Sequence, residues 1–374
     1  MKKLLVASTA LVAFAAVNSA QAADPIKLSV GGFQEAWVGY TDQDDDGQNK
    51  YANLLVQTDT ELSFQGSTKL DNGLTIAARI DVTADRGDNG AEDDSYMQIS
   101  SDTLGLVRLG ATKGASYGLS HAAPDVGIGH TDGDVENWIA RPSTGYANGV
   151  VGSTYSINQT QPTSNSGNDG HKVVYLSPNF GGVQFGASYG LNANGVNGQA
   201  VNVGGTNTGS DIMYDAAIAY NGEFGGVSIG ADFGYHLIDN GGTTGPAVDD
   251  EVTKRGGLSL GVAGFTLAGS YMDKDNFATV KDQGAKAWDL GVSYATGPYA
   301  VSVSYLDVSV DDAANSSTED TEQSWMVSGS YDLGAGVTAR ASVFAIEYDD
   351  ASATGTTVND NDGFGIVTGL TVAF

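Results

Sequence analysis

The sequence contains no cysteine, only 7 prolines and only 17 lysines and arginines in 374 residues. Without cysteine, disulfide bonds cannot stabilise the fold. Nucleic-acid binding is excluded because phosphate contacts require clusters of lysine and arginine, and the chain has none. Its 45 acidic residues give a strong negative net charge, which keeps loops soluble and attracts cations.

Long apolar runs are also missing, apart from a short one near the start. A basic MKK precedes the apolar stretch Leu4–Val17, and the small residues Ala20 and Ala22 form a cleavage site. We expect residues 1–22 to be a secretory signal peptide and residues 23–374 to form the mature domain. A membrane helix is the alternative, but this stretch is too short for one.

The chain is rich in glycine and tyrosine, and its apolar and polar residues alternate along short segments. Both features favour β-structure with tight turns. In residues 74–82, Leu74, Ile76, Ala78, Ile80 and Val82 fall on one face, and Thr75, Ala77, Arg79 and Asp81 fall on the other. Such alternation predicts strands with one apolar face. In lipid every backbone polar group must be paired, which strands achieve only in a closed sheet.

Alternating segments of about ten residues follow one another to the end of the chain, separated in turn by short Gly-rich turns and longer acidic loops. This pattern predicts an all-β fold, a 16-stranded antiparallel transmembrane β-barrel. Soluble β-sandwiches also alternate, but the absence of a domain linker and the tyrosines near strand ends favour the barrel. The expected strands begin near Leu28, Tyr51, Leu74, Asp93, Leu106, His171, Val183, Ile212, Val227, Lys254, Phe265, Ala285, Tyr299, Gln323, Val337 and Gly363.

One connection, from Lys113 to Gly170, is far longer than ordinary loops. It carries aromatic residues such as Trp138, which need a surface to pack on. We expect this loop to fold into the channel and narrow it. The resulting pore constriction would combine the loop residues Asp125, Asp132, Asp134 and Glu136 with the basic residues Arg79, Arg108, Lys113 and possibly Arg340. The alternative is an outer loop whose carboxylates are only solvated.

Three segments resemble the general porins of Gram-negative bacteria. KLSVGGFQEAWVGY (residues 27–40) is similar to the first strand of that family. VVYLSPNFGGVQFGASYG (residues 173–190) looks like the strand-turn-strand unit that follows its constriction loop. The terminal GLTVAF, with Phe374 last, resembles the family's outer-membrane assembly signal.

The resemblance implies a sixteen-stranded barrel, usually a homotrimer, whose third loop folds inward. By position it assigns the acidic loop residues named above to the constriction, and Arg79 and Arg108 to the basic wall on the third and fifth strands. The chain departs from the family in having few basic residues. We therefore expect a preference for cations.

Other chemistry has weak support. None of the four histidines, His121, His130, His171 and His236, lies in a catalytic signature, so we expect no enzyme. No cofactor is expected. Calcium is a hypothesis for the acidic stretches at residues 42–46 and 81–94, although neither has EF-hand spacing. The alternative there is a solvated loop, or one that bridges lipopolysaccharide through divalent ions.

The sequence therefore predicts an outer-membrane porin of a Gram-negative bacterium. Its channel would be water-filled, would favour cations, and would serve the passive diffusion of small hydrophilic solutes. Its partners would be these solutes and ions, outer-membrane lipid and lipopolysaccharide, and further copies of the chain. A substrate-specific channel for a sugar or an anion is the alternative, and a barrel enzyme or an adhesin ranks below it.

Overall fold

The computed structural model describes residues 25–44, 50–84, 92–129, 134–140, 170–192, 211–239, 249–277, 280–311, 319–349 and 360–374. Within them, sixteen strands account for nearly all regular structure. The strands are β1 (Lys27–Gln43), β2 (Leu54–Lys69), β3 (Thr75–Thr83), β4 (Glu92–Ser101), β5 (Gly105–Ala111), β6 (His171–Leu176), β7 (Val183–Asn192), β8 (Asp211–Phe224), β9 (Val227–Asp239), β10 (Glu251–Val262), β11 (Phe265–Asp275), β12 (Ala285–Thr296), β13 (Tyr299–Asp311), β14 (Glu319–Gly334), β15 (Val337–Asp349) and β16 (Asn361–Ala373).

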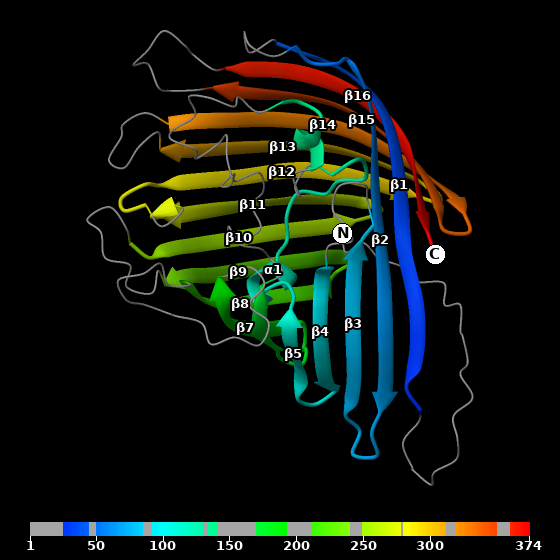
Figure 1. Cartoon of the computed structure of the whole chain (residues 1–374), viewed down its shortest axis with the longest axis vertical. Helices are drawn as coiled ribbons and strands as arrows, with labels where there is room; N and C mark the ends of the chain where they lie inside the picture. Colours follow the sequence, from blue (N-terminus) through cyan, green and yellow to red (C-terminus); the bar gives the residue numbers. More distant parts are fainter. Residues whose placement is uncertain are drawn as a thin grey trace.

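The strands form one closed barrel in which each strand pairs antiparallel with its neighbours in sequence, and β1 pairs with β16 (Figure 1). The closing seam runs from Phe33 opposite Ala373 to Gln43 opposite Gly363. At its end, Gly32 and Phe374 exchange two backbone hydrogen bonds of 3.0 Å. No strand edge is left open along this seam, which is what a membrane-spanning sheet requires.

The predicted fold class is thus confirmed, and the strand starts agree closely. His171, Val183, Val227, Phe265, Ala285, Tyr299 and Val337 begin strands at the expected residues. The largest shift is at β14, which begins at Glu319 instead of Gln323. The expected signal peptide, residues 1–22, lies outside the described residues.

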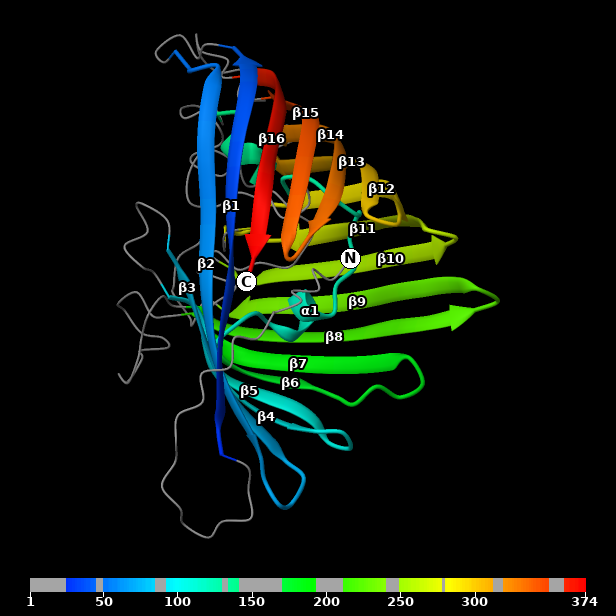
Figure 2. The same ribbon diagram turned by 90° about the vertical axis from the view of Figure 1, so that its right-hand side faces the viewer.

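Short turns join the strands at one end of the barrel (Figure 2). In the turn between β8 and β9, Gly225 and Gly226 have φ of 61° and 81°, and between β10 and β11 even Ala263 has a φ of 51°. Glycine adopts such angles without steric cost, which is why the tight turns are rich in it.

Each strand has two distinct faces. The outer face is apolar and exposed: Val56 is 74% exposed, Leu290 51% and Val303 49%. The inner face carries serines, charged residues and a group of apolar residues, and most of these are buried; Ser302 and Ser304 are examples on β13. The alternation predicted for residues 74–82 is confirmed, since Ala78 and Ile80 are exposed while Ala77 and Asp81 are buried.

Two short helical elements lie between β5 and β6. They are α1 (Ala115–Gly118) and the 3₁₀ turn η1 (Asp134–Asn137). No described helix has the length and apolar character needed to cross a membrane.

The two faces predict different responses to charge. Replacing Val303 on the outer face of β13 with arginine should lower the free energy of unfolding by about 2–4 kcal/mol, because the charge would enter hydrocarbon. The same substitution at half-buried Thr338 on the inner face of β15 should leave it nearly unchanged. Urea unfolding in lipid vesicles, followed by tryptophan fluorescence, would measure both. Equal losses would contradict the assignment of the faces.

Candidate pore lining and constriction

The predicted basic residue Arg79 lies on the inner face of β3 and forms a salt bridge with Asp81. Its Nε lies 2.6 Å from Oδ2 of Asp81, two residues along the same strand. Its Nη2 also donates to the hydroxyl of Ser63 on β2, at 3.4 Å. The Arg79 side chain remains 31% exposed, whereas that of Asp81 is 3% exposed. Arg79 therefore reaches the aqueous interior with its charge largely offset by a neighbour.

Two further predicted basic residues lie near aromatic rings. Arg108 on β5 donates to Gln98 on β4 at 3.0 Å, and its guanidinium lies 4.9 Å from the ring centroid of Tyr96. Lys113 follows β5, and its ammonium lies 5.3 Å from the ring of Tyr117 in α1. These cation–π contacts hold Arg108 against β4 and Lys113 against α1.

The segment that follows β5 is tied to the inner face at α1. The backbone N–H of Ala115 donates to Ser188 on β7 at 2.8 Å. Oδ2 of Asp215 on β8 accepts two bonds from Ser116, from its hydroxyl at 2.7 Å and from its backbone N–H at 3.1 Å. Gly114 is needed here, because a Cβ at this position would collide with the Asp215 carboxylate. α1 contacts β6 to β9, as both views indicate (Figures 1 and 2).

His121 forms the second attachment. Oδ1 of Asp232 on β9 accepts from the His121 backbone at 2.7 Å and lies 3.0 Å from Nδ1 of its ring. Asn221 on β8 contacts the other ring nitrogen at 2.9 Å. Arg255 on β10 completes the arrangement by pairing with Asp232 and donating to the His121 carbonyl at 2.6 Å.

These contacts affect the charge on the imidazole. The hydrogen bond with the Asp232 carboxylate raises the pKa of His121 above its ordinary value, while burial and the Arg255 charge oppose the rise. The protonated form is therefore favoured in the folded protein, and it is lost as the pH rises through the raised pKa.

Further along, the segment is attached to successive strands by its backbone. The N–H of Ala123 donates to Asp289 on β12 at 2.7 Å. Val126 and Ile128 donate to hydroxyls on β13 and β15, Ser302 and Ser342, each at 3.2 Å. Residues 115–128 thus donate to six strands between β7 and β15, with carboxylates and serines as the acceptors.

Beyond residue 128 the attachment becomes apolar. Ile128, Val135, Trp138 and Ile139 are buried in one cluster with inner-face residues of β1 and β11 to β16. Polar contacts border it: Gln57 on β2 donates to the Asn137 carbonyl at 2.9 Å, and the Ala140 N–H donates to Gln43 on β1 at 2.7 Å. The strand residues of the cluster are Trp37, Met272, Ala285, Ala287, Leu306, Val308, Val310, Met326, Phe344, Ile346, Tyr348 and Val367, joined by Phe277 just after β11.

This cluster differs from the sequence expectation in one respect. Alternation predicted strands with a single apolar face. Instead the inner face of β11 to β16 is apolar along part of its length, because side chains from the segment cover it. Burial of this area, worth about 25 cal/mol per Å², stabilises both the segment and the wall.

The acidic loop residues that we predicted are described only in part. The half-buried Asp125 accepts from the backbone of Gly127 at 2.7 Å. Asp132 lies outside the described residues, as do the side chains of Asp134 and Glu136, whose backbone forms η1. Arg340 lies 3.4 Å from Glu35 across the β1–β16 seam and 3.4 Å from the Gly127 carbonyl. The expectation that these loop carboxylates line a constriction stays a prediction.

Sequence reasoning missed the anchoring residues Asp215, Asp232 and Asp289. A signal was present at Asp289, which is a lone carboxylate among the inner-facing alanines, glycine and serine of β12. A carboxylate is costly to bury without partners, so an anchoring role could have been suspected there. The partners of the three residues could not have been named, since Ser116 lies 99 residues from Asp215.

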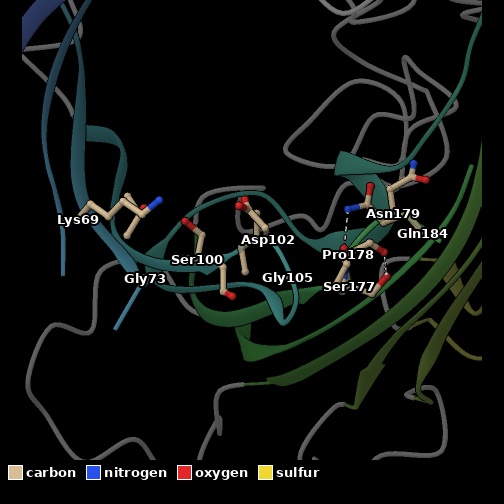
Figure 3. A pocket seen from close by; sticks show the side chains of 12 residues that line it. Lys69, Gly73, Ser100, Asp102, Gly105, Ser177, Pro178, Asn179 and Gln184 are labelled. Carbon is tan, nitrogen blue, oxygen red and sulfur yellow. Dashed lines mark hydrogen bonds between the residues drawn. The ribbon is translucent and has the colours of Figure 1, made fainter. Parts of the chain in front are cut away.

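Other possible sites are less developed. Among the described residues, no three His, Asp or Glu side chains are arranged to hold a metal ion, and residues 45–49 and 85–91 of the calcium hypothesis lie outside them. A polar depression of about 260 Å³ lies beside the short turns (Figure 3). It is lined by Lys69, Ser100, Asp102 and Gln184, among others, and no catalytic arrangement is present in it.

Comparisons with known proteins agree with the barrel fold. The model of a family described as Gram-negative porin matches residues 7–351. Among curated proteins, no sequence matches. The anion-selective porin from Comamonas acidovorans superposes with a TM-score of 0.61 at 16% identity, covering 94% of this chain and 100% of that one.

Two other structures are similar. OmpT, an outer membrane protein of Vibrio cholerae in its trimer form, gives a TM-score of 0.61 at 12% identity over 94% of this chain and all of its own. A mutant of the Rh. blastica porin gives 0.53 at 16% identity over 93% of this chain and all of its own. With the family model covering most of the sequence, the chain belongs to the Gram-negative porins.

Proposed function

We propose that this outer-membrane porin forms a water-filled channel that favours cations and serves the passive diffusion of small hydrophilic solutes. Family and fold indicate a channel and not an enzyme. The fold does not determine ion preference, because the similar Comamonas porin is anion-selective. That preference must come from the side chains that face the water.

The pairing of four inner-face cations with carboxylates is the observation that carries the proposal. Arg79 is paired with Asp81, Arg255 with Asp232, Lys274 with Glu251 and Arg340 with Glu35. Each positive charge is thereby offset within a few ångströms. Other inner-face carboxylates are Asp59, Glu61, Asp215 and Asp289, and with them we expect the lumen to carry an excess of negative charge. Such an excess concentrates cations and repels anions.

We further propose that residues 112–129 and 134–140 narrow the channel. Their contacts extend from β7 to β15 and on to β1, which supports a position across the barrel. The open path would then run between this segment and the inner face of β2 to β5, where Arg79, Arg108 and Lys113 lie. Because the segment is held by buried carboxylates and by an apolar cluster, we expect it to act as a fixed wall.

The outer face supports assembly with other copies of the chain. Aromatic side chains at lipid interfaces form girdles around membrane barrels. Here they are concentrated on the outer face of β6 to β14, and β15, β16 and β1 to β5 carry few besides Tyr40, Phe64 and Phe364. We infer that β15, β16 and β1 to β5 contact neighbouring copies of the chain in a homotrimer. The aromatics of β6 to β14 are Tyr175, Phe185, Tyr189, Tyr214, Tyr220, Phe224, Phe233, Tyr235, Phe265, Tyr271, Trp288, Tyr294, Tyr299, Tyr305, Trp325 and Tyr331.

Ion preference can be measured directly. In planar bilayers under a KCl gradient, the protein should open in conductance steps. The reversal potential should have the same sign as the equilibrium potential of potassium. Replacing Asp132, Asp134 and Glu136 with their amides should reduce the cation preference, because the segment would lose negative charge near the path. If the folded protein gave no conductance, the proposal of a channel would be wrong. An unchanged reversal potential in the triple variant would place these residues away from the path.

The preference should also depend on pH through His121. Its pKa is raised by Asp232, so it is positively charged at low pH and neutral above its pKa. Raising the pH from about 6 to about 9 removes this positive charge from the segment, and the cation preference should increase. The variant His121→Gln should have a flatter profile in this range. A profile identical to that of the unmodified protein would show that His121 does not act on the path.

The trimer interface can be tested on the outer face. Val56→Arg on β2 should convert trimers to monomers, because the charge would be buried between protomers. Val303→Arg on β13 should keep the trimer, although it destabilises the barrel. Non-denaturing electrophoresis and ultracentrifugation in detergent would distinguish them. Retention of the trimer by Val56→Arg, or its loss in both variants, would contradict the placement of the interface.

A further inference from the structure

The polar depression beside the short turns lies on the inner wall, at the mouth of the barrel (Figure 3). Three residues of its lining, Lys69 on β2, Thr75 on β3 and Ser100 on β4, lie directly opposite one another in the strand pairing. Thr75 is four residues from Arg79 on the same strand, so this row belongs to the inner face. Short turns lie at the periplasmic end of outer-membrane barrels. The depression therefore borders the periplasmic mouth of the proposed channel.

Two opposite charges line this depression without neutralising each other. The ammonium of Lys69 comes from the end of β2, and the carboxylate of Asp102 comes from the turn between β4 and β5. Both residues are exposed, and neither side chain has a hydrogen bond or an ion pair within the described ranges. Figure 3 shows Asp102 between Lys69 and the group formed by Ser177 and Gln184. Both charges are therefore available to a ligand that enters from the water.

The far side of the depression is held by its own hydrogen bonds. Nε2 of Gln184 on β7 donates to the carbonyl of Ser177 at 2.8 Å, which leaves the side-chain oxygen of Gln184 for a ligand. The Ser177 hydroxyl accepts from the N–H of Phe185 at 3.0 Å. Gly105, at the start of β5, has a φ of 81°, and a Cβ there would collide with the Leu176 carbonyl. The wall is thus formed before a ligand arrives, which lowers the entropy cost of binding.

The charges and the size of the depression indicate a class of ligand. A molecule with a single charge would be attracted by Lys69 or Asp102 and repelled by the other. An uncharged molecule binds mainly through apolar and aromatic side chains, and this lining contains no aromatic residue. A zwitterion can pair with both charges at once. The volume of about 260 Å³ lies below the range of about 300–1,000 Å³ for drug-sized molecules and suits an amino acid.

We propose that this depression is a binding site for small zwitterions of the amino-acid class, at the periplasmic exit of the channel. Lys69 pairs with the carboxylate of the ligand and Asp102 with its ammonium group. The inference rests on the proposed channel function and deepens it by naming a class of solute. Ion pairs exposed to water are weak, so the dissociation constant lies in the millimolar range. Weak binding suits a passage, because a solute that enters must also leave.

The test compares four molecules that share a three-carbon frame. L-serine carries both charges, glycerate keeps only the carboxylate, serinol keeps only the ammonium group, and glycerol has neither. Each is titrated at neutral pH and low ionic strength into the folded protein in detergent, and binding is followed by saturation-transfer NMR. L-serine should bind most tightly. Glycerate and serinol should bind about two- to fivefold more weakly, which is the effect of one solvent-exposed ion pair.

Variants assign the two charges to their partners. Lys69→Met should weaken the binding of L-serine about two- to fivefold and should not weaken that of serinol. Asp102→Asn should weaken L-serine binding by a similar factor and should not weaken that of glycerate. Lys27→Met and Glu223→Gln are the matched controls, because they remove exposed charges at the same end of the barrel but outside the depression. Both controls should bind L-serine as the unmodified protein does.

The outcomes separate this inference from the proposed function, because binding in detergent does not depend on conduction. Equal affinities for the four molecules, unchanged L-serine binding in Lys69→Met and Asp102→Asn, or equal weakening in the two controls would each overturn the site. A protein that conducts in bilayers but does not bind L-serine refutes this inference alone. A protein that binds L-serine but gives no conductance refutes the channel and leaves the site in place.

Discussion

The pairing of backbone hydrogen-bonding groups is the constraint on which the rest of this structure depends. Hydrocarbon offers no partners to a free N–H or C=O, so each strand must be paired on both sides. The pairing of β1 with β16 meets this requirement and turns the sheet into a closed wall. Closure places one face of the sheet in lipid, where side chains must be apolar. The other face encloses the lumen, where charged side chains are tolerated.

The inside uses that freedom in two ways. On β7 to β15, carboxylates and serines accept hydrogen bonds from the backbone of residues 115–128, as Asp215, Asp232 and Asp289 do. On β3, Arg79 stays in contact with water and pairs with the buried Asp81 two residues away. One part of the wall supports the segment, and another borders the proposed open path.

The fold could be predicted from sequence because period 2 is a local property. The assignment of Arg79 and Asp81 to one face required only their spacing, and the turns near Gly225 followed from glycine's tolerance of positive φ. The site was harder. That Ser116 meets Asp215, or that Arg79 is offset by Asp81 and connected to Ser63, depends on register and on the path of a long connection.

The contacts between Gly32 and Phe374 have a consequence for the order of folding. The strand that completes the seam is the last one in the chain, so no earlier intermediate can be a closed wall. Hairpins between successive strands are local and can form early, whereas the seam joins segments more than three hundred residues apart and requires a large loss of chain entropy. Until that step, β1 and the latest strand formed both expose an open edge to neighbouring chains. Shielding of these two edges before closure is therefore a kinetic requirement of this topology.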